Sequence, residues 1–269
     1  MPFTLSLAQV HVQLGQPQAN YAVAEETIHE AAGRNSTLIL FPELWSSGYD
    51  LPHGVQHSQA NAEILQRFSR LARQHHIWIG CSLLEAEGQK VFNTFHIVSP
   101  DSGEVTAQYR KIHRMRLMDE HIWLHAGSQP CLTPVAGVPT GLAICYDLRF
   151  PELFRRYALD GARLILLPAE WPLSRIAHWD VLLQARAIEN QMFVAAVNNV
   201  GESGGKTFGG HSALISPWGE FLLHGDSRQE ALLTATIDLD QVDQIRQRIP
   251  VFSDRRPDVY ELPSKKKSE

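Results

Sequence analysis

Short apolar runs alternate along most of this chain with longer segments in which apolar residues recur at helical spacing. Apolar runs typical of buried strands occupy residues 3–10, 37–41, 77–84, 138–144, 164–167, 193–197 and 232–237. Helical spacing predicts helices over residues 20–32, 60–74, 151–160, 174–191 and 240–249, with Ser174 as an N-cap. This alternation favours an α/β fold.

Two further pairs of strands are predicted as hairpins, because short turn sequences rich in Pro and Gly join them. The paired runs are 91–99 with 105–109, and 211–216 with 221–223. We expect loops over residues 44–59, 112–129 and 198–210. Each half of the chain thus runs strand, helix, strand, helix, strand, hairpin. We interpret this as one domain of two similar halves, with two sheet layers between outer helices.

Composition is typical of a globular protein: the 269 residues are 44% hydrophobic and 20% charged. The formal net charge of -5 gives no electrostatic case for binding nucleic acid or an anionic membrane. No apolar run is long enough to span a membrane, and the first residues lack the pattern of a signal peptide. The three cysteines are widely spaced, which favours a reducing cytoplasm.

An apolar run that stops at a cysteine marks the stretch from Thr140 to Glu152. Residues 141–144 are apolar, polar residues follow Cys145 at once, and Pro151 is a residue favoured in the first turn of a helix. We expect Cys145 at a strand-to-helix bend, near the positive end of a helix dipole, where a thiolate nucleophile is stabilised. A lone cysteine is more often a buried structural residue, so this interpretation depends on the rest of the chain.

Two more ionisable residues follow predicted strands: Glu43 after residues 37–41 and Lys111 after residues 105–109. Ligands collect at this edge of open α/β sheets. The thiol of Cys145 can act as a nucleophile, the carboxylate of Glu43 can relay protons, and the ammonium of Lys111 can stabilise an oxyanion. Together these three groups predict a reaction in which the acyl group of an amide moves from nitrogen to sulfur and forms a thioester. Each residue taken alone has a simpler interpretation: Glu43 as one partner of a surface ion pair, and Lys111 as a solvent-exposed lysine.

Several motifs together resemble the nitrilase superfamily of carbon–nitrogen hydrolases over essentially the whole chain. They are FPEL at 41–44, YRKIH at 109–113, GLAICYDLRFPEL at 141–153, LLQARAIENQ at 182–191 and GGHSALISPWGE at 209–220. The resemblance implies a four-layer αββα sandwich and a catalytic triad of Glu43, Lys111 and Cys145. It also implies that Glu120 supports Lys111 and that the Tyr146 N–H completes the oxyanion hole.

Within that superfamily the chain is most similar to the ω-amidase branch, on the ICYDLRFPEL, PAEWP (168–172) and AHW (177–179) stretches. The resemblance implies hydrolysis of the terminal amide of short dicarboxylic acid monoamides, such as 2-oxoglutaramate and 2-oxosuccinamate. The alternatives are an amidase of other specificity, acting on deaminated glutathione or N-carbamoyl compounds, and a catalytically silent binding or assembly module. The branch also implies a homodimer or higher homo-oligomer, with contributions from the helix at 174–191 and the C-terminal arm.

Aromatic and basic residues near these motifs are candidates for the substrate pocket. Tyr49, Trp171 and Phe208 are expected to line it, although core packing is the default for each aromatic residue. The substrate's far carboxylate needs a cation, for which the candidates are Arg175, Arg116 and Lys206.

No cofactor or metal is expected. His121 and His125 are four residues apart, but their neighbourhood lacks a strong helical pattern, which argues against a metal site. Asp147 and Arg149 are expected to brace the bend rather than do chemistry. Arg186 and Glu189 are expected to pair on one helical face.

The domain is expected to span residues 1–263, with an extended arm from about residue 250, rich in Pro and charge. The basic run Lys265–Lys267 places a disordered tail at 264–269.

Overall fold

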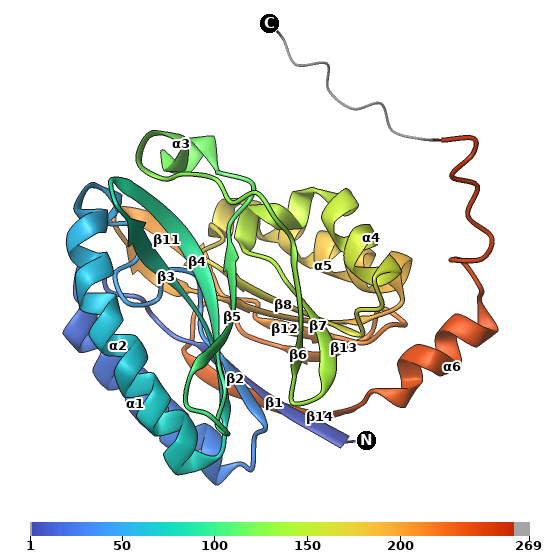
Figure 1. Cartoon of the computed structure of the whole chain (residues 1–269), viewed down its shortest axis with the longest axis horizontal. Helices are drawn as coiled ribbons and strands as arrows, with labels where there is room; N and C mark the ends of the chain where they lie inside the picture. Colours follow the sequence, from blue (N-terminus) through green and yellow to red (C-terminus); the bar gives the residue numbers. More distant parts are fainter. Residues whose placement is uncertain (1, 261–269) are drawn as a thin grey trace, which may run out of the picture.

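Two six-stranded sheets lie face to face at the centre of the computed structural model, which describes residues 2–260 (Figure 1). The strands of the first sheet, in spatial order, are β14 (Ala231–Asp238), β1 (Pro2–Gln9), β2 (Leu38–Leu40), β3 (Trp78–Glu87), β4 (Lys90–Val98) and β5 (Val105–Arg110). Those of the second are β13 (Phe221–His224), β12 (Ala213–Ile215), β9 (Phe193–Asn198), β8 (Leu164–Ala169), β7 (Val138–Leu142) and β6 (Cys131–Val135). A separate hairpin joins β10 (Val200–Ser203) and β11 (Lys206–Gly209).

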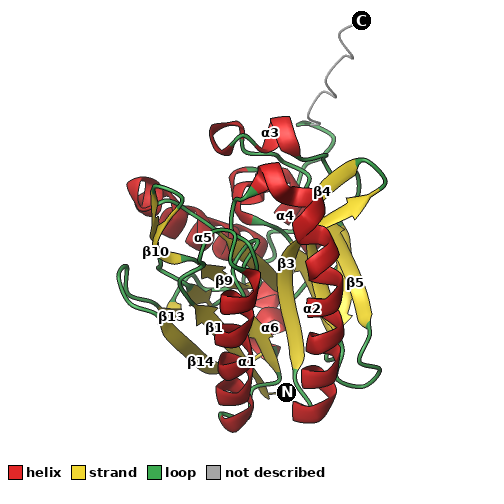
Figure 2. Ribbon diagram, turned by 90° about the vertical axis from the view of Figure 1, so that its left-hand side faces the viewer, coloured by secondary structure: helices red, strands yellow, loops and turns green. Residues whose placement is uncertain are grey.

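Helices cover the outer faces of the two sheets: α1 (Pro17–Gly33) and α2 (Gly54–His75) on the first, and α4 (Pro151–Leu159) and α5 (Ile176–Asn190) on the second (Figure 1). The short α3 (Glu120–Trp123) lies between β5 and β6 in the chain, and α6 (Asp240–Arg248) follows β14. Short 3₁₀ turns are η1 (Leu51–His53), η2 (Arg116–Met118), η3 (Cys145–Arg149) and η4 (Leu173–Arg175). Figures 1 and 2 show α1 and α2 together on the first sheet, and α4 and α5 on the opposite side of the molecule. The predicted αββα layering is confirmed.

Alternation along β2 explains why the sheet needs cover on both faces. Leu38 and Leu40 belong to the core between the two sheets, together with residues such as Leu166 of β8. Ile39 between them points the other way and packs in the cluster under α1 and α2, with Phe68. A strand apolar on both faces must be covered on both sides, which the sequence shows as an unbroken apolar run. Within residues 2–260, no helix is both long and apolar enough to cross a lipid bilayer.

The structure corrects several predicted boundaries. The helix α2 begins at Gly54 rather than residue 60, because its largely polar first turns show little apolar periodicity. Ser174 is not an N-cap: it lies in η4, and Arg175 precedes α5. The strand β6 was not predicted, since alternate residues of this edge strand are half-exposed. The glycine-rich stretch at 198–210 forms the β10–β11 hairpin rather than a loop.

Gly127 fills a position at the end of β5 that no other residue fits. Its N–H donates to the Lys111 carbonyl at 2.8 Å, and a Cβ placed on it would lie 1.9 Å from the Arg110 carbonyl oxygen. This contact fixes the backbone that carries Lys111.

We therefore expect Gly127→Ala to lower the free energy of unfolding by about 2 kcal/mol or more, because the backbone must move to accept the methyl group. Gly33→Ala is the control: no atom lies within 4 Å of its added Cβ among the described residues, so we expect a change within about 0.5 kcal/mol. Urea unfolding measures both. Equal stabilities of the two variants would contradict this account.

Candidate active site

Cys145 lies at a sharp bend just beyond β7, where the chain enters η3. Its φ of +43° is in the left-handed region, which is costly for a residue with a side chain. The fully buried Asp147 holds the bend: one oxygen accepts from the Ile144 N–H (2.9 Å) and the Tyr109 hydroxyl (2.7 Å), and the other accepts from the His113 ring at 2.7 Å. Asp147 therefore braces the bend, as predicted from the sequence.

Glu43 follows β2 and is fully buried at the facing ends of the two sheets. Its Oε1 accepts hydrogen bonds from Lys111 Nζ at 2.7 Å and Asn93 Nδ2 at 2.8 Å. Its Oε2 accepts from the backbone N–H of Glu170, which follows β8 in the other sheet, at 3.0 Å. The carboxylate is thus fixed by three donors. Asn93, in the interior of β4, was not predicted, because nothing in its local sequence distinguishes it from a packing residue.

Lys111 and Glu120 complete a buried charge cluster with Glu43. Lys111 Nζ donates to Glu120 Oε1 at 2.5 Å, and the Tyr49 hydroxyl donates to the same oxygen at 2.7 Å. Glu120 Oε2 accepts from the Met115 N–H at 2.6 Å. Burial alone would lower the pKa of Lys111, but the charges of Glu120 and Glu43 outweigh it and raise that pKa well above its usual value. Lys111 is therefore a permanent ammonium ion.

The Cys145 thiol faces this cluster and is held in its protonated form. Burial raises its pKa well above the usual range, the charge of Glu43 adds to this, and a hydrogen bond from the thiol to Glu43 adds further. Lys111 acts in the opposite direction but does not compensate. The expectation of a thiolate stabilised by a helix dipole is therefore wrong. A helix dipole acts only within about its first turn, and Cys145 precedes α4 by six residues.

A small pocket opens in front of the thiol. Its lining contains Tyr49, Trp171 and Arg175, which were predicted to line it, and Tyr146, which was predicted only to supply a backbone N–H. It also contains residues that were not predicted to line it: Met115, Met118, Arg149, Glu170 and Pro172. Arg149 stacks over the Trp171 ring at 4.8 Å, so it contributes a wall of this pocket. Phe208 does not line the pocket; it is buried in β11, where its backbone bridges to Pro172.

An adjoining cleft connects this pocket with the surface. The pocket has a volume of about 10 Å³, room for about one water molecule, whereas the cleft measures about 460 Å³. The two share Met118, Pro172 and Arg175, and Lys206 also lines the cleft. Two of the candidate cations thus lie on the path to the thiol. Arg116 lines neither cavity.

Within residues 2–260, one group of side chains has donor atoms close enough together to hold a metal ion. It comprises Asp180, His211 and His224, with donor atoms within 4.8 Å of one another. Asp180 already hydrogen-bonds His211 at 2.9 Å and His224 at 3.2 Å. None of the three lines the thiol pocket, and neither His121 nor His125 belongs to the group.

Comparisons of the sequence with a family model and with known proteins all indicate the same family. A family model described as carbon-nitrogen hydrolase matches residues 4–247. A 2-oxoglutaramate amidase of Bacillus subtilis (strain 168) is 40% identical over 263 residues, which cover 97% of this chain and 100% of the relative. The omega-amidase NIT2 of Homo sapiens is 32% identical over 275 residues, covering 98% and 99% of the two chains.

Solved structures agree with the sequence relatives. The crystal structure of XC1258 from Xanthomonas campestris, a CN-hydrolase superfamily protein with an arsenic adduct in the active site, matches with a TM-score of 0.89. The two chains are 29% identical, with 95% of this chain and 98% of the other covered. This chain is therefore an amide-hydrolysing enzyme of the carbon–nitrogen hydrolase family, and within the nitrilase superfamily it is most similar to the ω-amidase branch.

Proposed function

We propose that this enzyme hydrolyses the terminal amide of short dicarboxylic acid monoamides, of the 2-oxoglutaramate and 2-oxosuccinamate type, to the acid and ammonia. The observation that carries the proposal is the buried cluster in which Glu43 and Lys111 face the Cys145 thiol. The position of Arg175, shared by the pocket and the cleft, supports a substrate with a far carboxylate. Relatives named 2-oxoglutaramate amidase and omega-amidase support the same substrate class.

The first half of the reaction forms a thioester. Glu43 takes the thiol proton as the Cys145 sulfur bonds to the amide carbon, so that a protonated thiol becomes a nucleophile only with substrate in place. The Lys111 ammonium and the Tyr146 backbone N–H stabilise the oxyanion that forms. Glu43 then gives the proton to the amide nitrogen, the carbon–nitrogen bond breaks, and ammonia leaves.

The second half releases the acid. Glu43 takes a proton from water, and the resulting hydroxide attacks the thioester carbon. The oxyanion forms at the same donors, the carbon–sulfur bond breaks, and the proton on Glu43 returns to the Cys145 sulfur. The net reaction is amide plus water to carboxylic acid plus ammonia.

Glu120 has a supporting role in this scheme. It shares the Lys111 ammonium with Glu43, so the ammonium stays in place while the Glu43 charge is lost and regained. Burial, followed by the charge of Glu43, raises the pKa of Glu120, whereas Lys111 lowers it. Both oxygens of Glu120 already accept hydrogen bonds, one from Lys111 and Tyr49 and the other from the Met115 N–H. The Cys145 thiol hydrogen-bonds to Glu43 instead, so we assign proton transfer to Glu43.

Removing the proposed nucleophile tests the mechanism most simply. We expect Cys145→Ala and Glu43→Gln each to lower kcat for 2-oxoglutaramate by about 10³-fold or more, because neither variant can form or activate the thiolate. Cys131→Ala, at a partly exposed thiol that does not line the pocket, is the control and should keep its activity. Turnover by folded Cys145→Ala at the wild-type rate would exclude the mechanism.

Arg175 provides a test of substrate class. We expect Arg175→Met to raise KM for 2-oxoglutaramate by about 10-fold or more, because a charge-assisted contact is lost, and to leave the uncharged amide pentanamide nearly unchanged. The exposed Arg116, outside both cavities, gives the control Arg116→Met. If the wild type releases ammonia faster from deaminated glutathione or N-carbamoyl compounds than from 2-oxoglutaramate, the substrate proposal is wrong while the hydrolase assignment stands.

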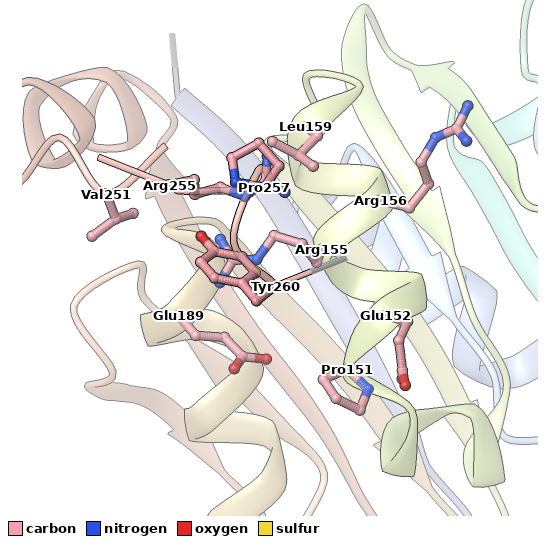
Figure 3. Close-up of a pocket in the computed structure, with 10 residues that line it drawn as sticks. All are labelled: Pro151, Glu152, Arg155, Arg156, Leu159, Glu189, Val251, Arg255, Pro257 and Tyr260. Atoms are coloured by element: carbon pink, nitrogen blue, oxygen red, sulfur yellow. The ribbon is translucent and has the colours of Figure 1, made fainter. Parts of the chain in front are cut away.

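We also propose that two copies associate through the face formed by α4, α5 and the C-terminal arm, here residues 251–260. Figure 3 shows residues of this arm opposite α4 and α5. The groove that they line has a volume of about 760 Å³, and Leu159 and Tyr260 are among its lining residues. Ile188 of α5 and Tyr260 are each about half exposed, which supports burial by a second copy.

Ile188→Glu tests the assembly: we expect it to shift the enzyme toward monomers in sedimentation experiments, since a charge in an apolar interface is costly. Val55→Glu, at a similarly exposed apolar residue on α2, is the control and should sediment like the wild type. An unchanged sedimentation coefficient for Ile188→Glu would rule out this face.

A cytoplasmic location and a single domain over residues 1–263 remain part of the proposal. The three cysteines are free thiols, which supports a reducing compartment. The predicted tail at 264–269 lies outside the described residues.

A further inference from the structure

Glu170 places a third carboxyl group in the thiol pocket, and the mechanism above does not use its side chain. The residue follows β8 directly and is only 2% exposed. Its backbone N–H holds Glu43 at 3.0 Å, so the main chain at this position is fixed whatever the side chain does. The side chain lines the pocket beside Cys145, Trp171 and Arg175.

The carboxyl group of Glu170 is incompletely satisfied. Among the described residues, its buried Oε1 has no partner at standard hydrogen-bond geometry. The side-chain amide of Asn199 lies near enough to act on the carboxyl group as a hydrogen-bond donor, which lowers the pKa of Glu170. Buried polar atoms are rarely left without a well-formed hydrogen bond. Because Glu170 lines the pocket, its carboxyl group is placed to meet a substrate that enters there.

The surroundings of this carboxyl group favour its protonated form. Burial raises the pKa of Glu170 well above its usual value, and the charge of Glu43 raises it further. Asn199, Lys206 and Lys111 lower it but do not compensate. The other ionisable groups that line the pocket are Tyr49, Cys145, Tyr146, Arg149 and Arg175. Glu170 therefore offers an O–H donor rather than a negative charge.

We propose that Glu170 is a specificity-determining residue whose protonated carboxyl donates a hydrogen bond to the carboxylate end of the substrate, beside Arg175. This inference rests on the proposed substrate class and deepens it. An O–H donor to a carboxylate makes a short, charge-assisted hydrogen bond, whereas an ionised Glu170 would repel the same group. The pocket thus accepts an anionic substrate although it contains an acid.

The test compares glutaramate with pentanamide, an uncharged amide with the same number of carbons. Glu170→Met keeps the volume and removes the donor. We expect it to lower kcat/KM for glutaramate about 10- to 100-fold, mainly through KM, and to change pentanamide by less than about threefold. Glu170→Gln keeps a donor and should restore most of the glutaramate activity. Thermal unfolding checks that both variants fold.

The pH dependence of the preference for glutaramate distinguishes a hydrogen bond donated by Glu170 from a packing role of its side chain. The donor is present below the pKa of Glu170 and is lost as the pH rises through it, so the wild-type preference for glutaramate should fall over that range. Glu170→Gln does not titrate there and should keep a constant preference; a fall that persists in it would come from Cys145, Tyr49 or a cation instead.

Four results overturn the inference. Equal losses on both substrates in Glu170→Met would indicate a structural role, and no loss on either would indicate no role. A wild type that does not prefer glutaramate over pentanamide would overturn the substrate proposal and this inference together. A wild-type preference that survives in Glu170→Met would overturn this inference alone.

Discussion

The site depends on one buried ammonium ion between two carboxylates. Lys111 is 2% exposed and can remain charged there only because Glu43 and Glu120 lie at 2.7 and 2.5 Å. Removing one partner of such a buried pair typically costs about 3–5 kcal/mol, because an uncompensated charge is left behind. Burial raises the pKa of the Cys145 thiol, and the carboxylates of this cluster raise it further, since they oppose another negative charge beside them.

The stacking of two sheets brings this cluster together. Glu43 ends a strand of one sheet, whereas Cys145 and Glu170 end strands of the other. The hydrogen bond from the Glu170 N–H to Glu43 joins residues 127 positions apart and ties the two sheets at the thiol. Stability and chemistry therefore share the same contacts, and the bend at Cys145 is held by the buried Asp147 rather than by the helix that follows it.

Sequence reasoning located the residues that carry strong local signals. The ends of apolar runs placed Glu43, Lys111 and Cys145, and the structure brings all three together. Sequence reasoning missed Asn93, because a polar residue inside a strand is not distinguished from a packing residue until the same sheet brings Glu43 beside it. It also missed Glu170, whose contact with Glu43 exists only because the two sheets meet there. The expected thiolate failed for a related reason: burial of the thiol and its distance from α4 are properties of the tertiary structure.

The most direct test of this account is the ionisation of the Cys145 thiol in the free enzyme. Thiolate absorbance is followed against pH in the wild type and in Cys145→Ser, and the difference isolates this one sulfur. The account predicts no thiolate from Cys145 at pH about 8.5, where an ordinary cysteine is half ionised, and ionisation only at higher pH. A thiolate already formed at neutral pH, without substrate, would contradict it.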